Sequence, residues 1–167
     1  FLEKDSIRNG LPIKGGTNDI LSIFNEGFFD VLMIGIGYKH MAQRKNLFER
    51  FHSVIPFGKI IHSSCYIDPT SNIGVGSFLY PGCVIDLNVT INENVILYTG
   101  CCISHDTTIG KHSIFSPAIN IAGFVNTGEC LNLGIGTTII DNLTICDNVR
   151  TGAGTVIINN IVNPGLY

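Results

Sequence analysis

The sequence predicts a mainly β protein, a parallel β-helix preceded by a small α/β segment, and three observations support this prediction. An apolar residue recurs at every sixth position from Ile61 to Ile157, and only Thr127 and Thr151 interrupt the series. The fourth residue after each of these positions is also small or apolar. The segment 1–58 lacks this pattern and contains helical and continuous apolar runs instead.

The six-residue period sets the architecture of residues 59–167. It is neither the period of an α-helix nor the alternation of a plain strand, and it is typical of hexapeptide repeats in a parallel β-helix. One large and one small inward residue per hexad fit a narrow triangular prism, so three hexads make one coil. A β-sandwich of short strands is the alternative, but it would not hold this frame over seventeen steps.

Turn-forming residues stand between the inward positions, where a prism needs corners. Glycine, asparagine, aspartate and proline tolerate or preset the backbone dihedral angles of tight turns. Such residues in these hexads include Asp68, Pro69, Gly74, Pro81, Gly82, Asn92, Gly110, Asn120, Gly134, Gly136, Gly152 and Gly154.

Residues 1–58 predict a small α/β unit, because strand and helix patterns alternate there. Residues 28–36 (FFDVLMIGI) form a continuous apolar run, which is typical of a buried parallel strand. We expect a short helix over 19–25 and a longer one over 41–54 with Leu47, Phe48, Phe51 and Val54 on one face.

Length and charge exclude several classes of protein. The 167 residues suffice for one sizeable core and a small appendage. The net charge is -3, only 14% of residues are charged, and no basic run favours nucleic acid. No apolar stretch is long enough to span a bilayer, and no secretory signal is visible at the start. We therefore expect neither a nucleic-acid partner nor membrane insertion.

The cysteine spacing bears on the compartment. Cys65, Cys83 and Cys101 recur at every third hexad, so they should stack on successive coils and point inward. Side chains on such a ladder run parallel, which suits a disulfide poorly even at a strand spacing of about 4.8 Å. We interpret these cysteines as small buried hydrophobic residues, which favours a reducing, cytoplasmic compartment.

Several stretches together resemble the bacterial sugar acetyltransferases of the NeuD/PglD type. They are residues 1–4 (FLEK), 10–16 (GLPIKGG), 36–37 (IG), 60–65 (IIHSSC), 103–106 (ISHD) and 122–123 (AG). The hexads also resemble the [LIV]-[GAED]-x-x-[STAV]-x pattern of left-handed β-helix acyltransferases.

The resemblance implies a two-part chain and an activity. Residues 1–58 would be part of a Rossmann-like nucleotide-sugar-binding domain, and residues 59–167 a left-handed β-helix that binds acetyl-CoA. The family forms homotrimers with sites between subunits. It transfers acetyl from acetyl-CoA to an amino group, in many members that of a UDP-linked 4-amino sugar. The family's Gly-rich nucleotide loop is not in this sequence, which begins where the second strand would end, so truncation or disorder is the expected reason; a true absence would argue against nucleotide-sugar binding.

His105 and Asp106 are the candidate catalytic residues. Formation of an amide requires a base that removes a proton from the attacking amine, and histidine suits this role near neutral pH. His105 matches the family's catalytic histidine, and Asp106 stands where members carry a carboxylate that orients it. As the third residue of its hexad, His105 should project outward at a corner, with Gly123 one coil later in the same column leaving room for a ligand.

The resemblance also implies binding residues. Gly123 would lie near the thioester, and its N–H could polarise the thioester carbonyl; Ile135 and Ala153 would follow along the CoA groove. Ile114 replaces a second histidine that contacts acetyl-CoA in many members, so it could only line the site. Glu3, Lys4 and Gly37 match nucleotide-sugar positions, although Lys4 replaces an acid there. No metal ion is implied.

The remaining histidines predict ordinary structural roles. His112 follows Gly110 in a turn, and we interpret it as exposed. His62 is expected to be structural, and His40 and His52 are expected at the surface of the longer helix or its ends.

Three other functions remain open. A sugar O-acetyltransferase would need the same base, so His105 does not separate the two reactions. A zinc enzyme of the γ-carbonic anhydrase kind needs three converging histidines, and His105 and His112 lack a third partner in the repeat. A structural or ice-binding β-helix would need regular exposed threonine columns and no appended α/β unit.

Overall fold

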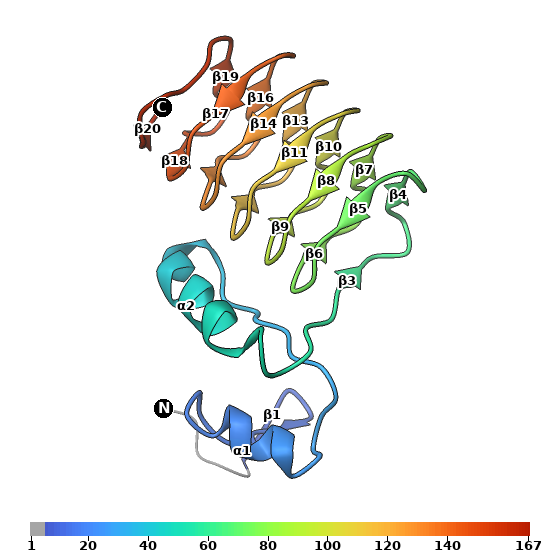
Figure 1. Cartoon of the computed structure of the whole chain (residues 1–167), viewed down its shortest axis with the longest axis vertical. Helices are drawn as coiled ribbons and strands as arrows, with labels where there is room; N and C mark the ends of the chain where they lie inside the picture. Colours follow the sequence, from blue (N-terminus) through green and yellow to red (C-terminus); the bar gives the residue numbers. More distant parts are fainter. Residues whose placement is uncertain (1–5) are drawn as a thin grey trace.

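Three parallel sheets wound into one coil dominate the structure, a computed structural model that describes residues 6–167 (Figure 1). We name the sheets face 1, face 2 and face 3. Face 1 contains β4 (Tyr66–Ile67), β7 (Val84–Ile85), β10 (Cys102–Ile103), β13 (Asn120–Ile121), β16 (Thr138–Ile139) and β19 (Val156–Ile157). Face 2 contains β5 (Asn72–Ile73), β8 (Thr90–Ile91), β11 (Thr108–Ile109), β14 (Asn126–Thr127) and β17 (Thr144–Ile145). Face 3 contains β3 (Ile60–Ile61), β6 (Phe78–Leu79), β9 (Ile96–Leu97), β12 (Ile114–Phe115), β15 (Asn132–Leu133), β18 (Val149–Arg150) and β20 (Gly165–Leu166).

The pairing register confirms the coil of three hexads. Cys102 of β10 pairs with Asn120 of β13, and Ile103 pairs with Ile121, both in parallel. The large residue of each hexad points into the prism, and Ile85, Ile103 and Ile109 are all 0% exposed. Burial of each such side chain stabilises the fold by about 1.5–3 kcal/mol, so the coil has one continuous apolar core.

The corners of the prism repeat one backbone conformation. The third residue after each large inward residue has a positive φ without interruption from Gly76 to Gly154. Asparagine and glycine occupy most of these positions because they adopt the left-handed region at little cost. Among the exceptions are Asp106 (φ 55°) and Phe124 (φ 58°).

The cysteine column lies inside the coil, as predicted. Cys83 and Cys101 are fully buried and Cys65 partly so, and all three thiols are free. The Cys83 thiol donates to the carbonyl of Tyr98 at 3.2 Å, and the Cys101 thiol to that of Ser116 at 3.3 Å. Backbone carbonyls of the next coil therefore satisfy these thiols.

The segment before the coil contains the two helices that the sequence predicts. The elements are β1 (Ile7–Arg8), β2 (Leu11–Pro12), α1 (Ile20–Asn25), the 3-10 helix η1 (Tyr38–His40) and α2 (Met41–Phe51). Phe48 and Phe51 of α2 are buried, as expected. The expected extension to Val54 is wrong: α2 ends at Phe51, and Val54 lies in the following turn with 53% exposure.

The buried strand expected over 28–36 is wrong as well. Leu32 makes a single parallel bridge with Phe57, and the only sheet among residues 6–58 is the antiparallel pair β1–β2. Ile34 packs in the small core with Phe48 and Phe57, whereas Phe28 is 59% exposed. One side of the run is therefore covered and the other is not, so it does not become a central strand within the described part of the chain.

Helix α2 packs on the corner between faces 2 and 3. Arg44 donates to the carbonyls of Asn94 and Gly76, and Phe48 meets the ring of His112 edge-on at 5.6 Å. The helix therefore covers His112, which is only 5% exposed. The interpretation of His112 as an exposed turn residue is wrong, because hexad spacing does not show what packs over a corner.

Candidate active site

His105 and Asp106 lie in the turn after β10, at the corner between faces 1 and 2. The His105 side chain is 42% exposed at the outer side of this corner, as its hexad position predicts. Asp106 adopts the left-handed conformation of the corners, which aspartate tolerates better than most residues. The tight turn brings the side chains of these two sequence neighbours within hydrogen-bond distance of each other.

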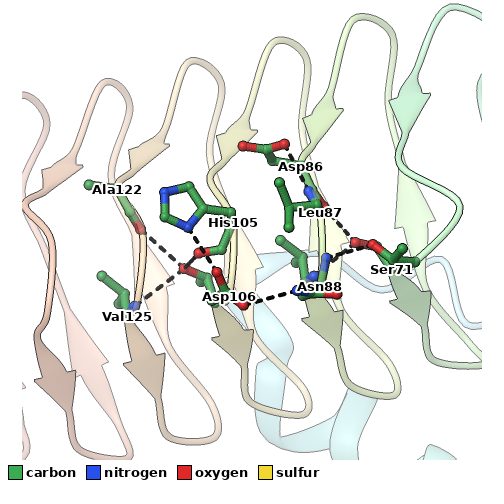
Figure 2. A network of polar contacts seen from close by, with 11 residues as sticks. Ser71, Asp86, Leu87, Asn88, His105, Asp106, Ala122 and Val125 are labelled. Atoms are coloured by element: carbon green, nitrogen blue, oxygen red, sulfur yellow. Dashed lines mark hydrogen bonds and ion pairs between the residues drawn. The ribbon is translucent and has the colours of Figure 1, made fainter.

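A chain of hydrogen bonds orients the imidazole of His105 (Figure 2). His105 Nδ1 and Asp106 Oδ2 are 3.0 Å apart, and Asn88 Nδ2 donates to Asp106 Oδ1 at 3.1 Å. The bond to His105, and after it the bond to Asn88, lower the pKa of the Asp106 carboxyl below its usual value. An imidazole that donates Nδ1–H to this carboxylate keeps Nε2 free to accept a proton.

Gly123 lies directly beside this imidazole. A Cβ on Gly123 would stand 2.6 Å from Cε1 and 2.8 Å from Nε2 of His105. The missing side chain therefore makes room for the imidazole itself, and the expectation that it leaves space for a ligand is corrected on this point. The N–H of Gly123 donates no hydrogen bond within residues 6–167, and the residue itself is buried beside the imidazole.

A groove on the outer side of face 1 begins next to these residues. Its volume is about 330 Å³. Ser104 and Ala122, the neighbours of His105 and Gly123 in sequence, form one edge of it. The other lining residues are Cys102, Asn120, Ile121, Thr138, Ile139, Ile140 and Asp141. A ligand in this groove would lie next to the turn that carries His105.

The other predicted binding residues lie elsewhere on the chain. Ile135 and Ala153 share a column, as predicted, but at the corner between faces 3 and 1, across face 1 from His105. Both are exposed, Ile135 by 59%. Gly37 lies over Tyr98 at that same corner, where a Cβ would be 3.9 Å from the Tyr98 hydroxyl.

Ile114 does not join the group around His105 within one chain. It stands on β12, on the outer side of face 3, and is 1% exposed. The segment from Gly37 to α2 contacts both corners that flank this face and so covers it. Glu3 and Lys4 lie outside the described residues.

The sequence predictions do not include two residues of this site, Asn88 and Phe124. Asn88 precedes Asp106 by three hexads, and Phe124 follows it by three hexads. The ring of Phe124 meets that of His105 edge-on, with centroids 5.1 Å apart and an interplanar angle of 85°. The three-hexad spacing is the signal that could have found both, because it places Asn88, Asp106 and Phe124 in one corner column.

The remaining histidines and carboxylates form no further centre in the described part of the chain. No group of three or more His, Cys, Asp or Glu side chains among residues 6–167 is placed to hold a metal ion. His62 bonds to Ser64 Oγ at 2.8 Å, and His40 and His52 are exposed, as expected. No helix in residues 6–167 has the length and apolar character needed to cross a bilayer.

Comparison with known proteins adds structural neighbours. No protein-family model and no curated sequence matches the chain. The GDP-perosamine N-acetyltransferase PerB from Caulobacter crescentus, solved with CoA and GDP-perosamine, is 27% identical with a TM-score of 0.85, over 95% of this chain and 75% of PerB. The acetyltransferase domain of PglB from Neisseria gonorrhoeae, solved with acetyl coenzyme A, is 23% identical with a TM-score of 0.87, over 99% of this chain and 78% of that one.

A third neighbour has the same fold. WeeI from Acinetobacter baumannii is 20% identical with a TM-score of 0.79, over 95% of this chain and 75% of WeeI. The likeness to PglB and WeeI shows the fold alone, while PerB adds an enzyme that binds CoA. These matches support the left-handed sense of the β-helix. Among these structural neighbours, PerB is a GDP-perosamine N-acetyltransferase solved with CoA, and the PglB domain is an acetyltransferase solved with acetyl coenzyme A, which is the class of enzyme that the sequence resemblance predicts.

Proposed function

We propose that this protein transfers acetyl from acetyl-CoA to the amino group of a nucleotide-linked amino sugar for surface-glycan synthesis, with His105 as the general base. One observation carries the proposal: Asp106 binds Nδ1 of His105 and leaves Nε2 without a partner among residues 6–167 beside Gly123, and the sequence neighbours Ser104 and Ala122 line the face 1 groove. PerB, solved with CoA and GDP-perosamine, supports the substrate class. Two further PerB structures carry alanine or asparagine in place of one histidine.

The chemistry follows from these positions. The amine nitrogen attacks the thioester carbonyl while Nε2 of His105 takes its proton, and the Asp106 carboxylate stabilises the imidazolium that forms. A new C–N bond replaces the C–S bond, and CoA leaves as the thiol once the proton is returned. The free N–H of Gly123 would stabilise the oxyanion.

The proposal includes an assembly and a division of labour. Residues 1–58 would belong to a Rossmann-like unit that binds the nucleotide sugar through Glu3, Lys4 and Gly37, and residues 59–167 would bind acetyl-CoA. A homotrimer would place Ile135 and Ala153 along clefts between subunits, whereas Ile114 lies buried under the segment from Gly37 to α2. In support, Val84 and Val156 on the outer side of face 1 are 40% and 61% exposed, and a second subunit would cover them. The free thiols support a cytoplasmic location.

An acetyl-CoA assay against GDP- and UDP-linked 4-amino sugars tests the proposal. We expect His105→Ala to lower kcat by about 10²–10⁴-fold, the usual contribution of a general base. His40→Ala is the control, because His40 is exposed and lies before α2, away from the corner of His105. Full activity of His105→Ala would overturn the base assignment. Activity only with hydroxyl acceptors would establish sugar O-acetylation instead.

A further inference from the structure

Phe124 is held in a conformation that phenylalanine rarely adopts. Its φ is 58°, in the left-handed region that costs an ordinary L-residue about 1–2 kcal/mol. The corner imposes this conformation, and the same column carries Asn88, Asp106 and Asn142, which tolerate it well. A bulky apolar side chain is therefore the unfavourable choice for this turn.

Burial does not offset this strain. Phe124 is 50% exposed, so its ring gains only part of the free energy that full burial would supply. Its one aromatic contact within residues 6–167 is the edge-on contact with His105, and its backbone N–H donates to the carbonyl of His105 at 3.1 Å. Strain that local stability does not explain indicates a functional constraint.

The ring of Phe124 completes the enclosure of the imidazole. Asp106 fixes His105 through Nδ1, and Gly123 leaves space for Cε1 and Nε2. A hydrogen bond at one atom still allows the half-exposed ring to swing about its side-chain bonds. The ring of Phe124 limits this rotation, because its centroid lies 5.1 Å from that of the His105 ring and the two rings are nearly perpendicular.

We propose that Phe124 is a positioning residue that holds the His105 imidazole in its reactive orientation. This inference rests on the proposed function, in which His105 is the base. Phe124 needs no contact with either substrate to act in this way. The Phe124 ring limits the rotation of the His105 side chain and so fixes the direction of Nε2. Loss of the Phe124 ring therefore lowers kcat and leaves the KM values for acetyl-CoA and for the amino sugar nearly unchanged.

The test is Phe124→Asn, because asparagine suits the left-handed corner and removes the ring. Relief of strain should raise Tm by about 2–4 °C, while kcat falls about tenfold or more because the base is misoriented. Phe124→Tyr keeps the ring edge and should retain wild-type kcat. Ala118→Asn is the matched control: Ala118 has the same φ of 58° at another corner, so it should raise Tm without changing kcat.

A spectroscopic measurement follows the contact itself. The Hε1 resonance of His105, identified by its loss in His105→Ala, should shift in Phe124→Asn and stay in place in Phe124→Tyr, because an aromatic ring shifts nearby protons.

Several outcomes would overturn the inference. Unchanged kcat in Phe124→Asn would refute it alone, even if His105→Ala is inactive. A joint fall of Tm and kcat would assign Phe124 a structural role, and a rise in KM for the acceptor alone would make it a substrate contact. Full activity of His105→Ala would refute the proposed base and this inference together.

Discussion

The Asp106 carboxylate is shared between two side chains, and this sharing can be tested. Asn88→Asp would place a second carboxylate where an amide now donates at 3.1 Å. Two like charges raise the pKa of at least one partner, which opposes the lowering that Asp106 now shows. Because the carboxylate must be ionised to hold His105, activity is lost as pH falls through the pKa of Asp106. We expect the acid limb of kcat/KM to move to higher pH.

Two variants separate this effect from a change in the backbone. Asn88→Gly keeps the left-handed φ of 54° and removes only the amide, so its loss of activity should be smaller than that of Asn88→Asp. Asn148→Asp has the same hexad position and a φ of 58°, but lies at the corner between faces 2 and 3, away from His105 and Asp106. Its pH profile should match the wild type. An unchanged profile in Asn88→Asp would show that Asn88 does not act on the pair.

Residue positions could be predicted where they follow from the coil. Spacing alone places His105 outward at a corner and Gly123 one coil beyond it, and the structure confirms both. The orientation of the His105 imidazole could not be predicted, because it depends on the hydrogen bond to Asp106 and on the absence of a Cβ at Gly123. The burial of Ile114 could not be predicted either, since α2 packs over its face from a distant part of the sequence.

At the scale of one corner, Gly110 is required by the neighbouring coil. A Cβ on Gly110 would stand 2.0 Å from the carbonyl oxygen of Gly128, and backbone cannot yield as a flexible side chain can. We expect Gly110→Ala to lower the free energy of unfolding by about 3 kcal/mol. Urea unfolding followed by circular dichroism measures the change.

Gly152 supplies the matched control for Gly110. It has the same hexad position, but a Cβ there meets nothing closer than 3.8 Å. Gly152→Ala should therefore change stability by less than about 0.5 kcal/mol. Equal destabilisation of the two variants would show that close stacking of coils does not explain the glycine at position 110.

A helix or strand could be predicted from the sequence when residues close to it in the chain determine which of its side chains are buried. Central strands of the coil such as β7, β10 and β13 bury a large residue against the coils before and after them, so the period alone locates them. The run 28–36 has the composition of a buried strand, but a parallel strand needs partners from distant sequence. Within residues 6–167 its partner is a single bridge at Phe57. Apolar composition there does not establish pairing, and of residues 28–36 only Ile34 is buried.

At the scale of the whole molecule, a buried polar cluster joins α2 to the coil. Arg44 is 1% exposed, and burial lowers the pKa of its guanidinium to about 10. It bonds to backbone carbonyls of two successive coils, at Gly76 and Asn94. The Asn94 side chain bonds in turn to His112 Nδ1 at 2.8 Å. The position of α2 on the coil therefore depends on buried polar contacts, although Arg44 Nε and Asn94 Oδ1 have no partner among residues 6–167.

This cluster makes the stability of the molecule depend on pH through His112. Burial, and after it Lys45, lower the pKa of His112 below its usual 6.5, while Glu129 and Glu49 act in the opposite direction. Unfolded His112 binds a proton as pH falls past about 6.5, whereas folded His112 stays neutral until lower pH. The contribution of neutral His112 to the free energy of unfolding is therefore complete above about pH 6.5 and is lost as pH falls from there through the lowered pKa of the folded state.

His112→Asn removes this titration and keeps the corner, because asparagine accepts the φ of 61° found there. We expect the wild-type Tm to fall more steeply than that of His112→Asn between about pH 7 and pH 5. The other four histidines are common to both proteins, so the difference in slope isolates His112. Thermal unfolding in buffers of matched ionic strength measures the slope. Parallel curves would mean that His112 is protonated equally in both states and that docking of α2 does not depend on its neutral form.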